Sequence, residues 1–122
     1  MLFTKKSTKA VGDYAESLAE DFLKAHKVKI LEKNFSCRSG EIDLIVKDKD
    51  TLVFVEVRYR KSTNFGQPFE TVTKTKQNKI IRSAQTYLQK HPKAANKACR
   101  FDVISIQQGE IDWIKNAFDT DS

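Results

Sequence analysis

Residues 40–60 read GEIDLIVKDKDTLVFVEVRYR, and this stretch decides the fold because it predicts two strands joined by a tight turn. Apolar residues recur at alternate positions on both sides of Lys49-Asp50, and a period of two is typical of strands. Side chains at i and i+2 share a face, so each strand can bury one face against a helix. Asp43 and Glu56 interrupt these runs, and two carboxylates that meet across strands need an explanation.

The turn also fixes the expected register of this hairpin. Counting outward from it, Asp43 faces Glu56 and Glu41 faces Arg58, which places four polar side chains in one cluster. The opposite face then carries the apolar set Leu44, Val46, Val53, Val55 and Val57. Directly opposed like charges destabilise a sheet by up to about 1 kcal/mol, so the cluster requires a cation, a shared proton or basic neighbours.

Spacing alone leaves two interpretations of the cluster open. In the first, Asp43 and Glu56 bind a divalent cation such as Mg²⁺, which often takes one or two carboxylates and completes its shell with water and phosphate. In the second, Glu41 pairs with Arg58 while the other two carboxylates point into solvent. Glu16, at the border of an apolar helical stripe, is either a third carboxylate over the sheet edge or an ordinary exposed residue.

The flanking sequence predicts the remaining elements. Apolar residues at three- and four-residue spacing predict two helices, and alternating segments predict three further strands. The helices are expected at 12–27 and 73–90, and the strands at 28–35, 100–106 and 110–114. The order helix, three strands, helix, two strands predicts an α/β domain with a mixed central sheet and a helix on each side.

Composition limits the organisation and the partners of the chain. Its 122 residues fit one domain, expected at 11–118 between a flexible basic arm at 1–10 and a frayed tail at 119–122. The net charge of +6 favours a polyanionic partner, nucleic acid first.

The lack of a long apolar run predicts no membrane partner. The polar N-terminus predicts a cytoplasmic location, and the lone Cys37 and Cys99 predict a reduced compartment without zinc.

Several segments together resemble a known family. They are GDYAESLAEDFL, KNFSCRSGEIDLIVKD, LVFVEVRYR, TVTKTKQNKI and CRFDVISI with DWIKNAF, which cover most of the chain. The segment GEID ends in Asp43, and the next predicted strand carries Glu56 followed two residues later by the basic Arg58. This pattern resembles that of the restriction-endonuclease-like, or PD-(D/E)xK, nucleases. More closely, the chain resembles the YraN-like family of small uncharacterised bacterial proteins, which is similar to Holliday-junction resolvases. This resemblance implies a restriction-endonuclease-like three-layer α/β/α fold.

The resemblance also implies roles for individual residues. By position, Asp43 and Glu56 would hold Mg²⁺, with Mn²⁺ as an alternative, and Glu16 would assist them. Arg58 stands where these nucleases carry a catalytic Lys. An Arg can stabilise the charge of a transition state, but it stays protonated in proteins, which makes it a poor proton acceptor.

A DNA-facing surface is expected beside this site. Basic and polar residues at the end of the second hairpin strand and early in the second helix can hold phosphates: Arg60, Lys74, Lys76, Gln77 and Lys79. Gln77 resembles a polar residue that some of these nucleases place near the metal, and the alternative is an ordinary surface Gln. Without a recognition-helix or zinc-finger signature, shape or junction recognition is favoured over base readout.

Three functions follow from these observations. The first is a metal-dependent endonuclease that acts on DNA, with branched DNA as one substrate class, and the resolvase likeness leaves a homodimer open. The second is a nucleic-acid-binding module that keeps the fold without turnover, which Arg58 favours. The third is an adaptor whose basic face docks an acidic protein, and it differs from the others because phosphate binding weakens steeply with salt.

Overall fold

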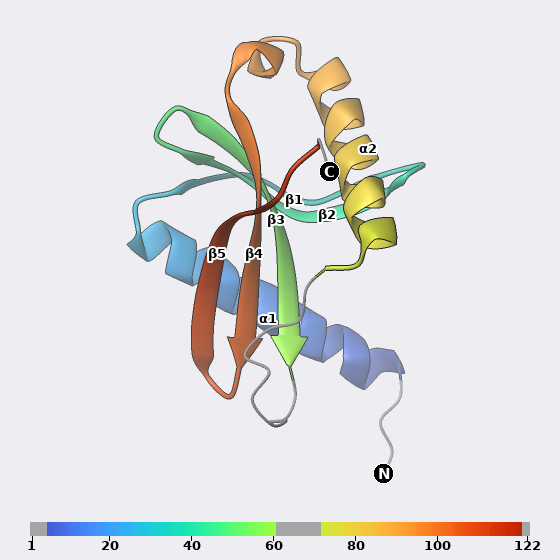
Figure 1. Ribbon diagram of the computed structural model, residues 1–122. Coiled ribbons are helices and arrows are strands. Elements are labelled where there is room, and N and C mark those ends of the chain that lie inside the picture. Colours follow the sequence, from blue (N-terminus) through green and yellow to red (C-terminus); the bar gives the residue numbers. More distant parts are fainter. Residues whose placement is uncertain (1–4, 61–71, 121–122) are drawn as a thin grey trace.

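The structure is a computed structural model that describes residues 5–60 and 72–120 (Figure 1). The order of its main elements is the predicted one, with one short 3₁₀ helix added before the fourth strand. The elements are α1 (Lys5–Ala25), β1 (Lys29–Cys37), β2 (Gly40–Asp48), β3 (Thr51–Arg60), α2 (Lys74–Lys90), η1 (Ala94–Asn96), β4 (Cys99–Gln107) and β5 (Glu110–Phe118).

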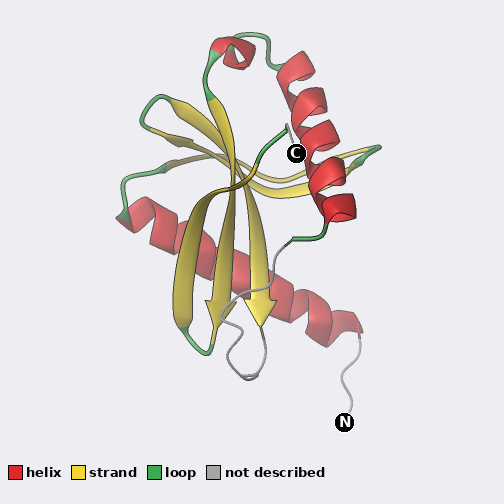
Figure 2. Cartoon of the chain, viewed as in Figure 1, coloured by secondary structure: helices red, strands yellow, loops and turns green. Residues whose placement is uncertain are grey.

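The strands form one five-stranded sheet in the order β1-β2-β3-β4-β5 (Figure 2). β3 and β4 pair in parallel, and the other neighbours pair antiparallel, so the predicted mixed sheet is confirmed. Parallel neighbours need a crossover connection, which here contains α2. The sheet therefore places the β2–β3 hairpin beside the crossover helix.

The two helices cover opposite faces of the sheet, as Figure 1 shows. On one face, α1 contributes Ala15, Ala19 and Leu23 to a cluster with apolar side chains of β2, β3 and β4: Leu44, Val46, Val53, Val55, Ile104 and Ile106. On the other, α2 contributes Ile80, Ala84 and Tyr87 to a cluster that includes Ile45, Leu52, Phe54 and Phe101. The predicted apolar face of the hairpin is thus buried, and it packs against α1.

Most boundaries lie within two residues of the predicted ones, and two differ by more. α1 begins at Lys5 rather than at residue 12, so residues 5–10 of the predicted arm are helical, while residues 1–4 lie outside the described part. β5 continues past Ile114 to Phe118, whose ring stacks on that of Phe101 at 5.1 Å. Asn116 has a φ of 54° and sits beside a register shift, which breaks the alternation that sequence analysis relies on.

A buried carboxylate fixes this irregular part of the sheet. Asp102 is 0% exposed and accepts the Trp113 Nε1–H at 2.8 Å and the Asn116 N–H at 2.9 Å. Arg100 donates to the same carboxylate at 2.9 Å and to Asp48 at 2.8 Å. A buried charge is tolerated when it is paired and hydrogen-bonded, so this network has a structural role.

Among the helices in residues 5–60 and 72–120, none combines the length and the hydropathy required to cross a lipid bilayer.

Candidate functional site

The predicted hairpin register is present in the pairs nearest the turn. Asp48 pairs with Thr51, and the register continues outward to Leu44 and Val55, where the β2–β3 ladder ends. β2 itself continues to Gly40 as the partner of β1. The first residue of β2 beyond the shared ladder is Asp43, so the candidate carboxylate lies where β2 and β3 separate.

β2 twists at Asp43. Ile42 packs in the α2-side cluster and Leu44 in the α1-side cluster, although residues two apart in a regular strand share a face. The expected direct pairs of residues 43 with 56 and 41 with 58 therefore fall past the end of the ladder. Instead, Asp43 reaches β3 through its side chain, because its Oδ2 accepts the Val57 N–H at 2.8 Å. The carboxylate takes the place of a backbone acceptor in the sheet.

The site has a strongly perturbed electrostatic state. Burial first, and then the charge of Glu56, raise the pKa of Asp43 to about 7, against the opposing effect of the Val57 N–H. Burial also raises the pKa of Glu56, which is 9% exposed, although Lys76, Arg58 and a hydrogen bond with Asp43 oppose the rise. Two carboxylates held together out of water favour a shared proton or a cation.

Basic side chains lie on the α2 side of this pair. The Lys76 Nζ is 3.7 Å from Glu56 Oε2, and the positive charge of Arg58 acts on the same carboxylate. Lys76 occupies the first turn of α2, where its backbone N–H donates to the Thr73 side chain at 3.2 Å. This N-cap starts the helix at a fixed residue and so sets where the ammonium group lies.

Glu16 belongs to α1, which covers the face of the sheet opposite α2, and it interacts electrostatically with Asp43. It is half-buried, and its pKa is raised by burial, by the charge of Asp43 and by that of Glu41, whereas a hydrogen bond with Asn34 lowers it. Sequence analysis could only place this residue at the border of the stripe, because its final position depends on how α1 crosses the sheet.

The donor set fits a hard cation that takes few protein ligands. In the two described stretches of chain, no group of three or more His, Cys, Asp and Glu side chains is arranged to hold a metal ion. Mg²⁺ is often held by one or two carboxylates, with water and phosphate as the remaining ligands. Asp43 and Glu56 could supply such a pair of carboxylates.

The other predicted phosphate-binding residues lie around α2 and β3 with different contacts. Gln77 donates its Nε2–H to the Val72 carbonyl at 2.8 Å, so its amide supports the start of the helix. With Lys74 it borders a cavity of about 420 Å³ against the end of β5. Lys79 lies beside Gly40 in the β1–β2 turn. Arg60 is half-buried at the end of β3, opposite Gln107.

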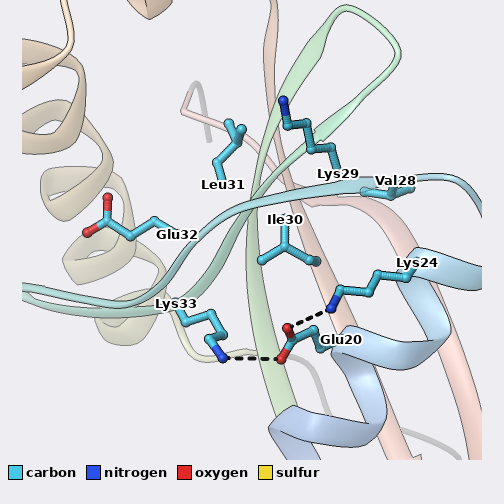
Figure 3. Close-up of a pocket in the computed structure, with 8 residues that line it drawn as sticks. All are labelled: Glu20, Lys24, Val28, Lys29, Ile30, Leu31, Glu32 and Lys33. Atoms are coloured by element: carbon cyan, nitrogen blue, oxygen red, sulfur yellow. Dashed lines mark ion pairs between the residues drawn. The ribbon is translucent and has the colours of Figure 1, made fainter.

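A larger cavity, of about 550 Å³, lies away from the carboxylate pair between α1 and β1 (Figure 3). Its Glu20 pairs with Lys24 at 3.2 Å and with Lys33 at 3.6 Å. Figure 3 shows Glu32 pointing away from Glu20, so the two carboxylates do not converge. Exposed ion pairs of this kind contribute little to stability, and nothing in the lining brings reactive groups together.

Comparison with known proteins gives a family without an assigned activity. The profile described as "Uncharacterised protein family UPF0102" matches residues 15–106, which include every candidate site residue. A UPF0102 protein of Saccharophagus degradans is 50% identical over 107 residues, covering 88% of this chain and 91% of its own. A UPF0102 protein of Stutzerimonas stutzeri is 48% identical over 113 residues, covering 89% and 94%.

Proposed function

The chain belongs to the uncharacterised protein family UPF0102, the YraN-like proteins, and from its carboxylate site we propose that it is a Mg²⁺-dependent endonuclease that acts on DNA. The observation that carries the proposal is the buried pair of Asp43 and Glu56. Burial raises the pKa of both groups, and the charge of Glu56 raises that of Asp43 further. Strongly perturbed carboxylates beside basic side chains are typical of catalytic and metal-binding sites.

The proposal assigns the fold to the restriction-endonuclease-like class. It is supported by the mixed sheet with one helix on each face and by the position of both carboxylates on the β2–β3 hairpin. It is also supported by Glu16, which belongs to the helix that precedes the sheet and acts electrostatically on Asp43. These three carboxylates come from the elements that the resemblance assigns to them.

Each residue then has a distinct role. Asp43 and Glu56 would hold the cation, and the Val57 N–H that binds Asp43 Oδ2 leaves Oδ1 as the oxygen available to it. A bound Mg²⁺ polarises a phosphodiester and lowers the pKa of an attacking water. Arg58 and Lys76 bring positive charge to where the phosphate accumulates negative charge. Glu16, whose pKa is raised by burial and by the charge of Asp43, is the carboxylate that would act as general base.

The test is cleavage of labelled four-way junction, flap, single-stranded and duplex DNA with Mg²⁺, Mn²⁺ or EDTA. We expect cleavage that requires the metal and falls at least about a hundredfold in Asp43→Asn, since the variant loses a ligand charge. Asp112→Asn, at an exposed position of β5, is the matched control and should cleave like the parent. Equal cleavage by the parent and Asp43→Asn would overturn the assignment of the site.

A second candidate function is DNA binding without cleavage, and Arg58 is the observation that favours it. Because an Arg stays charged, it cannot take a proton from the attacking water. Under this function no substrate is cut, and Asp43→Asn binds DNA as well as the parent or better, because one negative charge is gone. Binding measured by fluorescence anisotropy beside the cleavage assay separates the two functions.

A further inference from the structure

Cys37 lies at the tip of the β1–β2 hairpin, directly opposite Gly40 in the register. It is half-buried and packs against the cluster that α2 forms with the sheet. The backbone of Gly40 lies close to α2, because a Cβ placed on it would be within 4 Å of Ser83 and Lys79. The thiol therefore lies in a corner between the β1–β2 turn and the middle of α2.

Ser83 of α2 faces this corner with a buried hydroxyl. It is 0% exposed, and within the described residues its Oγ makes no hydrogen bond of standard distance and angle. A Cβ placed on Gly40 would lie 3.7 Å from this oxygen, so the hydroxyl is directed at the turn. A buried hydroxyl without a partner is unfavourable, so an acceptor at this place would stabilise it.

The surroundings of the thiol favour its anion. The Ser83 hydroxyl beside it lowers the pKa of Cys37 against the effect of burial, with smaller contributions from the backbone N–H groups of Ser39 and Gly40 and from Thr86. Successive backbone N–H groups in a turn form an anion-binding concavity. Cys99 is the contrast, because burial raises the pKa of its thiol.

The charged residues of the two elements that form the corner are mainly positive. Arg38 lies in the turn, and Lys79 of α2 lies beside Gly40. One turn of α2 beyond Thr86, the Lys90 ammonium lies 5.8 Å from the centre of the Phe35 ring. Glu41 follows the turn in β2 and is exposed. A thiolate in electropositive surroundings with partial exposure is the reactive form of cysteine.

We propose that Cys37 is a reactive thiol that hydroperoxides oxidise to a sulfenic acid, whose oxygen accepts a hydrogen bond from Ser83. The thiol first releases its proton to solvent. Its sulfur then attacks one peroxide oxygen, so that an S–O bond forms and the O–O bond breaks. The leaving alkoxide or hydroxide takes a proton from water. Sulfur loses two electrons and the peroxide gains them, which gives the sulfenic acid and an alcohol or water.

The experiment compares the two cysteines of the folded chain. Cys99→Ser leaves Cys37 as the only thiol, and Cys37→Ser leaves Cys99. Each protein is treated with hydrogen peroxide between pH 5.5 and 9, and the sulfenic acid is trapped with dimedone and quantified by mass spectrometry. We expect Cys37 to react about tenfold faster than Cys99 at pH 7, because burial raises the pKa of the Cys99 thiol.

Ser83→Ala in the Cys99→Ser background tests the hydroxyl. It removes one oxygen from a buried position. We expect the rate of Cys37 oxidation to fall about threefold or more, and the apparent pKa of Cys37 to rise. Thr75→Ala, on the exposed first turn of α2, is the control and should change neither. A Cys99 that reacts as fast as Cys37, or a Ser83→Ala protein that reacts like its parent, would overturn the proposal.

Discussion

At the scale of single residues, the ionisation of Asp43 connects the site to the stability of the fold. Its pKa is about 7 in the native protein and 3.8 in an unstructured chain. At a pH between these two pKa values, Asp43 keeps its proton in the native state and loses it in the unfolded state. The free energy of unfolding must therefore fall as the pH rises through this window.

Asp43→Asn should remove most of that fall, because an amide does not ionise and its oxygen can still accept the Val57 N–H. We expect the parent to lose about 1–3 kcal/mol between pH 5 and pH 8, and the variant to lose clearly less. Urea unfolding at the two pH values measures the difference, with Asp112→Asn as the reference. An unchanged pH dependence in Asp43→Asn would contradict the buried, coupled state of this carboxylate.

The sequence predicts the residues of the site better than their contacts. Counting from the hairpin turn identifies Asp43 and Glu56 as neighbours, since the register of a tight hairpin is set locally. The twist that directs Asp43 at the Val57 N–H is invisible in an alternating pattern. Asp102 was not predicted either, because its partners Trp113 and Asn116 come from another strand.

At the scale of elements, two glycines predict opposite effects of the same substitution. Gly40 has a φ of 146°, which side chains rarely adopt, so Gly40→Ala should destabilise the protein by about 1–3 kcal/mol. Gly12 lies in α1 with nothing within 4 Å of a Cβ, so Gly12→Ala should stabilise it by up to about 1 kcal/mol. Thermal unfolding of both variants shows whether each substitution raises or lowers the stability. A Gly40→Ala protein as stable as the parent would refute the prediction for Gly40.

Element types and order are predictable here because each helix has one apolar stripe, and because β2, β3 and β4 are apolar segments buried on both faces. The residues at which elements begin and end are less predictable. The extension of α1 to Lys5 adds polar residues that carry no periodic signal, and the end of β5 lies behind the bulge at Asn116. In both cases the ends depend on interactions that local sequence patterns do not contain.

At the scale of the whole molecule, the net charge of +6 predicts how DNA binding depends on salt. The logarithm of the association constant should fall linearly with the logarithm of the salt concentration. Lys79→Ala, on the turn side of α2, should reduce the slope by about one. Lys93→Ala, beyond the other end of α2, should leave it unchanged. Anisotropy titrations at several salt concentrations test this, and salt-independent binding would favour a protein partner instead.

The parallel pairing of β3 with β4 has a consequence for the order in which the protein folds. Asp48 and Thr51 meet across a two-residue turn, whereas Leu52 pairs with Cys99, far along the chain. Loop closure costs more entropy for distant partners, and folding rates fall as contact order rises. We expect the hairpin with both carboxylates to form early on the ribosome, and α2 to bring Lys76 to Glu56 only once β4 has been synthesised. Until the last third of the chain has been synthesised, the nascent protein would therefore hold Asp43 and Glu56 together without the positive charge of Lys76.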